Sequence, residues 1–153
     1  MPALAQFDFT HIFVSGGCNS RDYRAKLDSV DYYNIADDSW HDAPKLNTAR
    51  FGHSSCSVGR FIFVIGGEGS DGRLVTSVER IDARKLLTTS LGQEVTCWEQ
   101  VICPELARIS PLVSAIGHST EEIIVSGGLG RDSSYQSDAF VFHVESMSIL
   151  FDF

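Results

Sequence analysis

The stretch His11-Ile12-Phe13-Val14-Ser15-Gly16-Gly17 occurs in three versions along the chain. Residues 61–67 read Phe61-Ile62-Phe63-Val64-Ile65-Gly66-Gly67, and residues 123–128 read Ile123-Ile124-Val125-Ser126-Gly127-Gly128. Each version is a short β-branched and aromatic run that ends in a glycine pair, which indicates a β-strand followed by a tight change of direction. The first glycines of the pairs are 50 and 61 residues apart. The chain is therefore predicted to contain three similar β units of about 50 residues.

A second marker follows each glycine pair. Trp40 and Phe151 each lie 24 residues after the first glycine of their pair, whereas Trp98 lies 32 residues after Gly66. The regular spacing predicts that these aromatic side chains pack one unit against the next. The longer spacing in the middle unit predicts a loop insertion of about eight residues between Ala83 and Thr96.

A third marker precedes the glycine pair in two units. Arg50 lies nine residues before Gly59, and Arg108 lies nine residues before Gly117. Between the markers the residues alternate or run β-branched, and no segment keeps a helical period. Each unit is predicted to form four antiparallel strands. In the middle unit these are His53–Val58, Phe61–Ile65, Ser77–Asp82 and Cys97–Ile102.

These markers resemble the kelch family, whose repeat has an apolar strand ending in Gly-Gly, then a Tyr and a Trp, and an Arg-x-Gly-His phrase before the next unit. The resemblance covers nearly the whole chain and implies an all-β fold of three β-propeller blades, at approximately 1–45, 46–103 and 104–153. The residues taken as structural markers of the repeat are Gly16, Gly17, Gly66, Gly67, Gly127, Gly128, Tyr33, Trp40, Trp98, Phe151 and His53.

Composition and charge exclude several classes of partner. The 153 residues carry a formal net charge of −8, and no run of Lys or Arg could follow a phosphate backbone or an anionic membrane. No apolar stretch approaches the roughly 20 residues of a membrane span. The N-terminus has no secretory pattern, so the cytoplasm is the expected compartment, with association to the cytoskeleton as an alternative. The four scattered cysteines are expected to be reduced thiols.

Residues that could support catalysis or metal binding are scattered. The five histidines fall at different points of the repeat, and His53 is expected to pack blades or bond a turn. The glycine pairs lead into strands, whereas a phosphate-binding loop opens a helix. We therefore expect no catalytic residues, no metal site, no cofactor and no enzymatic activity. An enzyme of the kelch-like propeller type that acts on small molecules is the weakest alternative.

Binding is expected in the loops. In kelch propellers that bind peptides, the arginine before the innermost strand often lines the recognition face, and the resemblance places Arg50 and Arg108 there. A guanidinium pairs well with carboxylates, so an acidic peptide is the expected ligand. The alternative is a structural arginine that bonds loop carbonyls. The loops after the glycine pairs, at 18–28, 68–76 and 129–137, add Arg21, Arg24, Arg73 and Arg131.

The number of blades limits what the chain does alone. Propellers have four to eight blades, so three blades cannot close the ring. Further blades must come from the same longer chain, a second copy or another subunit. The expected function is a protein-interaction module, such as a substrate-recognition part of a scaffold or of a ubiquitin ligase adaptor. The alternative is a structural component of a cytoskeletal or ciliary assembly.

Overall fold

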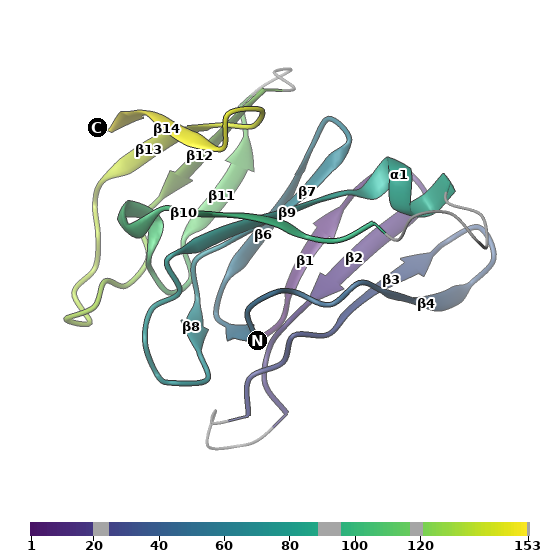
Figure 1. Cartoon of the computed structure of the whole chain (residues 1–153), viewed down its shortest axis with the longest axis horizontal. Coiled ribbons are helices and arrows are strands. Elements are labelled where there is room, and N and C mark those ends of the chain that lie inside the picture. The colour runs from purple at the N-terminus through teal and green to yellow at the C-terminus, as the bar shows by residue number, and fades with distance from the viewer. Residues whose placement is uncertain (20–24, 89–95, 117–120, 153) are drawn as a thin grey trace.

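A computed structural model describes residues 1–19, 25–88, 96–116 and 121–152. Within these ranges most of the regular structure is β-strand, and three four-stranded antiparallel sheets follow one another along the chain (Figure 1). The sheets confirm the predicted all-β fold with four strands in each unit. We call them the first, second and third blades in chain order.

Each blade consists of four long strands joined mainly by hairpins. The first blade contains β1 (Ala3–Gln6), β2 (His11–Ser15), β3 (Val30–Asn34) and β4 (Ser39–Ala43). The second contains β6 (Ser54–Val58), β7 (Phe61–Ile65), β9 (Ser77–Asp82) and β10 (Glu99–Ile102). The third contains β11 (Leu112–Ala115), β12 (Glu122–Ser126), β13 (Ala139–His143) and β14 (Ser148–Asp152). A small extra sheet joins β5 (Arg50–Phe51) to β8 (Glu68–Gly69). The strands of the second blade agree with the sequence prediction, apart from one or two residues at the start of β6 and β10.

The insertion in the second blade contains a short helix, α1 (Ala83–Thr88), where the sequence predicted only a loop. The helix begins directly after β9, and Asp82 Oδ1 accepts a hydrogen bond of 2.9 Å from the Lys85 amide. Ala83 is buried, and Leu86 and Leu87 pack against the core between the first two blades. Six residues are too few to show a helical period, which explains why the sequence pattern missed this element. A further single turn of 3-10 helix spans Pro104–Leu106.

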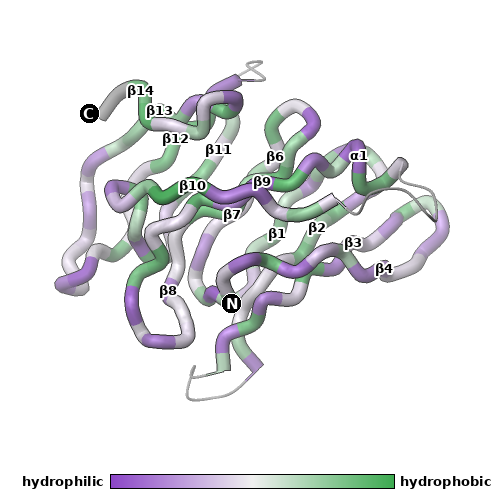
Figure 2. The backbone as a smooth tube through the Cα atoms, viewed as in Figure 1, coloured by the Kyte–Doolittle hydropathy of each residue, from purple (hydrophilic) through white to green (hydrophobic). Residues whose placement is uncertain are grey.

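The core consists of two layers, one between each pair of neighbouring blades. β7 is buried at all five residues because it packs on both sides. Phe63 and Ile65 belong to the layer shared with the third blade, and Ile62 and Val64 to the layer shared with the first. Figure 2 shows hydrophobic residues concentrated along the strands of the stacked blades. The second blade is thus the centre of the molecule.

The two terminal blades are buried on one side only. Burial alternates along β2 and β12, since every second side chain points away from the second blade. The exposed fraction of Leu4 and of Trp40 in the first blade is 62%, and that of Leu112 in the third blade is 67%. Each end of the stack therefore presents a partly apolar sheet face to its surroundings.

The glycine pairs hold the linkers between blades against the strand ends. The Gly17 amide donates to Arg50 O at 2.8 Å, and the Gly67 amide donates to Arg108 O at 2.7 Å. Gly16 has a positive φ of 56°, and a Cβ there would lie 2.7 Å from Arg50 O. Gly16 and its counterpart Gly66 are therefore required both for their backbone conformation and for the close approach of the next linker.

Candidate protein-interaction site

The guanidinium of Arg50 lies inside the protein with an exposed fraction of 0%. Nη1 donates to Gly66 O at 3.1 Å and to Ser77 O at 3.0 Å, and Nη2 donates to Ser77 Oγ at 2.9 Å. Nη2 also forms an ion pair of 2.5 Å with Glu79 Oε1. Burial lowers the pKa of Arg50 and the Glu79 carboxylate opposes that shift, so the guanidinium stays charged.

The Glu79 carboxylate connects this arginine to the backbone of the linker from the first blade. It accepts hydrogen bonds from the amides of Asn47 at 2.7 Å and Thr48 at 3.1 Å. The Glu79 side chain is also fully buried, and its charge is balanced by Arg50 and these two amides. These hydrogen bonds offset the free energy that it costs to remove the two charges of a buried ion pair from water.

Arg108 has a similar place in the third blade. Its exposed fraction is 4%, and Nη1 donates to Gly127 O at 3.2 Å and to Asp138 Oδ1 at 2.8 Å. Its guanidinium carbon lies 4.9 Å from the centre of the Phe140 ring. The hydrogen bond and charge of Arg108 lower the pKa of Asp138, although burial acts in the opposite direction.

That Arg50 and Arg108 line a recognition face stays a prediction, and the structure shows how each side chain is held. Both guanidinium groups bond loop carbonyls and carboxylates within the fold, as the structural alternative describes. Arg50 is fully buried, so its donors are used inside the protein. Arg108 lines a surface hollow together with Asp138 and Phe140.

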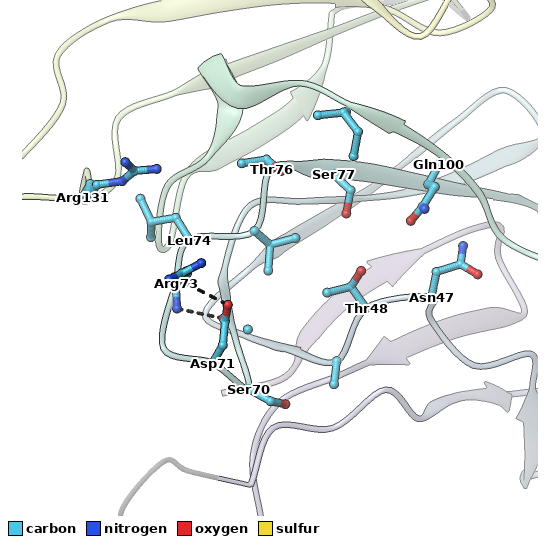
Figure 3. Close-up of a pocket in the computed structure, with 14 residues that line it drawn as sticks. Asn47, Thr48, Ser70, Asp71, Arg73, Leu74, Thr76, Ser77, Gln100 and Arg131 are labelled. Atoms are coloured by element: carbon cyan, nitrogen blue, oxygen red, sulfur yellow. Dashed lines mark hydrogen bonds and ion pairs between the residues drawn. The ribbon is translucent and has the colours of Figure 1, made fainter.

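Two of the loop arginines do lie together on the surface. Arg73, after the second glycine pair, and Arg131, after the third, both line two adjoining hollows, the first of which is shown in Figure 3. Arg131 also lines a third hollow. The hollows have volumes of about 660, 540 and 460 Å³, and Leu74 lines all three. We call this surface the loop groove, defined by Arg73, Leu74 and Arg131 with the loops 68–76 and 129–137.

The charges in the loop groove are only partly balanced within the chain. The Arg73 side chain is 87% exposed, and its Nε lies 3.9 Å from Asp71 Oδ2. Arg131 is exposed and has no ion pair with any residue that the structure describes. The carboxylate of Glu68 is paired with Lys26 at 2.8 Å, which joins the first loop to the second. The groove thus offers two accessible guanidinium groups beside an apolar side chain.

The other predicted loop arginines, Arg21 and Arg24, lie outside the described residues. Sequence reasoning did not single out Glu79 or Asp138, which hold the two linker arginines. A single carboxylate one to three residues after a loop is a weak sequence signal, because turns and their flanks commonly carry such residues. It also missed Leu74, whose place between two arginines depends on the packing of the second blade against the third.

Trp98 packs between blades, as its spacing predicted. Its exposed fraction is 4%, and its indole Nε1 donates to Pro44 O at 2.7 Å. Trp40 differs, because 62% of it is exposed. It contacts the Tyr33 ring at 5.2 Å on the outer side of the first blade, where the described chain supplies no further blade. The backbone of Phe151 pairs with Val141, and its side chain lies outside the described part.

His53 joins two blades, in agreement with the structural role expected for it. Its Nε2 lies 3.0 Å from Ser15 Oγ of the first blade, and only 5% of the residue is exposed. Burial, together with the charge of Arg50, lowers the pKa of His53 to about 3. The ring is therefore neutral at ordinary pH and suited to packing.

Among the described residues, no group of three or more His, Cys, Asp or Glu side chains is placed to hold a metal ion. The helices found there are also too short to cross a membrane.

Comparison with known proteins agrees with this architecture. Residues 10–47, which contain the first glycine pair and Trp40, match the family described as the kelch motif. The human protein "Kelch-like protein 34" is 29% identical over 101 residues, which cover 64% of this chain and 15% of the relative. The chain therefore matches only a small part of the length of that curated relative. These matches, together with the three blades and their repeated markers, support a kelch-repeat architecture for the chain.

Proposed function

We propose that the chain is a protein-interaction module that binds an acidic segment of a partner protein in the loop groove. The observation that carries this proposal is the presence of Arg131 and Leu74 in three adjoining hollows, with Arg73 in two of them. Two exposed guanidinium groups can each pair bidentately with a carboxylate. The apolar side chain between them can contact an apolar side chain of the same ligand.

The form of the groove favours an extended peptide over a small molecule. Its hollows adjoin one another along two loops held by the glycine pairs, and the linker residues 47–49 and part of β10 border the first hollow. The loops are themselves held by internal hydrogen bonds, such as those from the Val75 amide to Gly67 O and from the Gln136 amide to Gly128 O, both 2.9 Å. A ligand would therefore meet a preorganised surface, which lowers the cost of binding.

Within this proposal, the chain serves in the cytoplasm as the recognition part of a larger scaffold or ubiquitin ligase adaptor and has no enzymatic activity. Completing a propeller requires further blades from the same longer chain, a second copy or another subunit. A lasting structural role in a cytoskeletal or ciliary assembly is the second candidate. The exposed apolar faces at both ends of the blade stack favour it, because such faces suit stoichiometric assembly.

Affinity capture from a cell extract tests the proposal with a matched pair of variants. The groove variant carries Arg73→Glu and Arg131→Glu. The control variant carries Arg60→Glu and Arg84→Glu, which make the same change in charge at exposed residues outside the groove. Circular dichroism first establishes that both variants fold.

A partner recovered by the wild-type chain and the control, but reduced about tenfold or more with the groove variant, supports the loop groove as the site. Equal recovery by all three would contradict it. A stable assembly that all three form with fixed stoichiometry would favour the structural role.

A further inference from the structure

The first blade repeats the structural elements that hold Arg50 on the second blade, but no described arginine occupies them. Asp31 lies opposite Val14 in the first blade, as Glu79 lies opposite Val64 in the second. Both valines lie two residues before the first glycine of their pair. Asp31 is thus the positional counterpart of Glu79, the carboxylate that pairs with Arg50.

The second blade shows what covers such a site. The linker 44–50 runs across it and delivers Arg50 to Glu79, Ser77 and Gly66 O. Trp98 is fixed against the same linker in two ways: its Nε1 donates to Pro44 O, and its carbonyl accepts from Asn47 Nδ2 at 2.9 Å. Leu46 fills the apolar layer beside Trp98. A proline carbonyl, a leucine and an arginine within seven residues therefore form one docking unit.

The counterparts of these acceptors are present on the outer side of the first blade. Gly16 and Ser29 correspond to Gly66 and Ser77, since each glycine begins its pair and each serine lies two residues before the carboxylate, Asp31 or Glu79. Trp40 corresponds to Trp98. Trp40 directly precedes His41, which pairs with Tyr32, the residue after Asp31. Trp98 directly precedes Glu99, which pairs with Arg80, the residue after Glu79. The exposed fraction is 62% for Trp40 and 4% for Trp98. Within the described residues, Asp31 has no ion pair or side-chain hydrogen bond.

We propose that this outer face of the first blade is a binding site for an arginine-bearing segment of a partner polypeptide. The site consists of the Asp31 carboxylate, the Gly16 and Ser29 carbonyls and the Trp40 indole. Its ligand presents an arginine with a leucine four residues before it and a carbonyl acceptor two residues earlier still, as the linker 44–50 does on the second blade. The guanidinium pairs with Asp31, the leucine covers the Tyr33 and Trp40 rings, and the carbonyl accepts from Trp40 Nε1.

A second copy of the chain fits this site poorly. The opposite end of the stack is the third blade, and residues 139–153 contain no Arg or Lys that could reach Asp31. Arg50 and Arg108 are already used inside their own blades. A partner that buried Asp31 without a cation would leave a carboxylate unpaired, which is strongly unfavourable. The charge of Asp31 therefore selects an arginine-bearing partner.

Titration of the full chain with a synthetic peptide tests the proposal. The probe is the peptide of residues 43–51, and the readout is the pair of indole N–H signals in the ¹H–¹⁵N NMR spectrum, since the chain has 2 tryptophans. We expect the Trp40 signal to move progressively while the Trp98 signal stays in place. The Arg50→Ala version of the peptide should bind about tenfold more weakly or worse, because it lacks the charge-assisted hydrogen bonds.

The protein variants separate the specific site from general attraction. Asp31→Asn should weaken binding of the probe by about tenfold or more, whereas Asp132→Asn, which removes an equal charge at an exposed position of the third blade, should weaken it by less than about threefold. The unperturbed signals of each spectrum show that the variant is folded. Loss of capture by the loop groove variant would not affect this titration, because the two surfaces are separate.

Three results would overturn the proposal. The first is equal binding of the two peptides, or equal effects of the two Asp variants. The second is movement of the Trp98 signal in place of Trp40, which would mean exchange with the chain's own linker. The third is a Trp40 signal that moves with protein concentration before any peptide is added, which would show that a second copy covers the face.

Discussion

His53 and Arg50 lie close together between the first two blades, and each shows how burial sets the role of a polar residue. A histidine and an arginine beside a glycine pair could equally serve a ligand or the fold. Burial decides, because 5% of His53 and 0% of Arg50 is exposed. Arg50 keeps its charge through Glu79, while His53 loses its charge through desolvation and through Arg50 itself.

The low pKa of His53 predicts a loss of stability in mild acid. Its pKa is about 3 in the folded chain and about 6.5 when exposed. The unfolded chain therefore binds a proton that the folded chain excludes, and this contribution to stability, full above pH 6.5, falls as the pH drops toward 3. Between pH 7 and pH 5 the free energy of unfolding should decrease by about 2 kcal/mol from this residue.

Urea denaturation at the two pH values measures this effect. The His53→Gln variant should lose most of the difference between pH 7 and pH 5, and His143→Gln, at a partly exposed position, should retain it. The same pH dependence in all three proteins would show that His53 is not responsible.

At the scale of elements, the outer strands of the first and second blades carry the same marker in opposite surroundings. Trp98, just before β10, is covered by the first blade and by the linker, and Trp40, in β4, is mostly exposed. The two residues share a place in the repeat and differ only in whether a neighbouring blade packs on them. The position of a blade in the stack thus determines how much its tryptophan contributes to the stability of the fold.

This difference predicts unequal effects of two identical substitutions. Trp98→Ala should lower the free energy of unfolding by about 3–5 kcal/mol, because it leaves a cavity between blades and removes the bond to Pro44. Trp40→Ala should lower it by only about 0.5 kcal/mol, as at other exposed positions. Thermal or urea unfolding of the two variants gives the comparison. Comparable losses would mean that the outer side of the first blade is covered in solution.

At the scale of the whole molecule, the three blades form an open stack with one central sheet. Within the part of the chain that the structure describes, only the second blade is packed on both sides, and its strand β7 is buried throughout. β2 and β12, the corresponding strands of the first and third blades, are buried at alternate residues. Local stability should therefore decrease from the centre of the stack toward both ends.

Amide hydrogen exchange measures this gradient directly. The amides of β7 should exchange more slowly than those of β2 and β12 by about tenfold or more, because opening β7 requires disruption of both apolar layers. Mass spectrometry at low micromolar concentration keeps association between copies small. Slower exchange in β2 than in β7 would show that the first blade is stabilised by contacts beyond those described.

Much of the architecture could be predicted from particular residues. The three glycine pairs, the aromatic residues after them and the alternating strands identified the blades, and the strands of the second blade were placed to within two residues. Local geometry explains this success, because a strand end that needs a positive φ and close approach of a linker admits little other than glycine. The helix α1 was missed because its start depends on Asp82 as a cap and on a buried place for Ala83.

The sequence by itself determined the repeat and the all-β blades, since these depend on short spacings within each unit. Only the tertiary structure decided the roles of the arginines and tryptophans. Arg50 and Arg131 were both predicted from the sequence to lie on the binding face. Arg50 instead pairs with a buried carboxylate, whereas Arg131 lines a surface groove. Trp40 and Trp98 likewise differ only in their neighbours. The physical reason is that burial and charge pairing are set by packing between blades, which joins residues far apart in the chain.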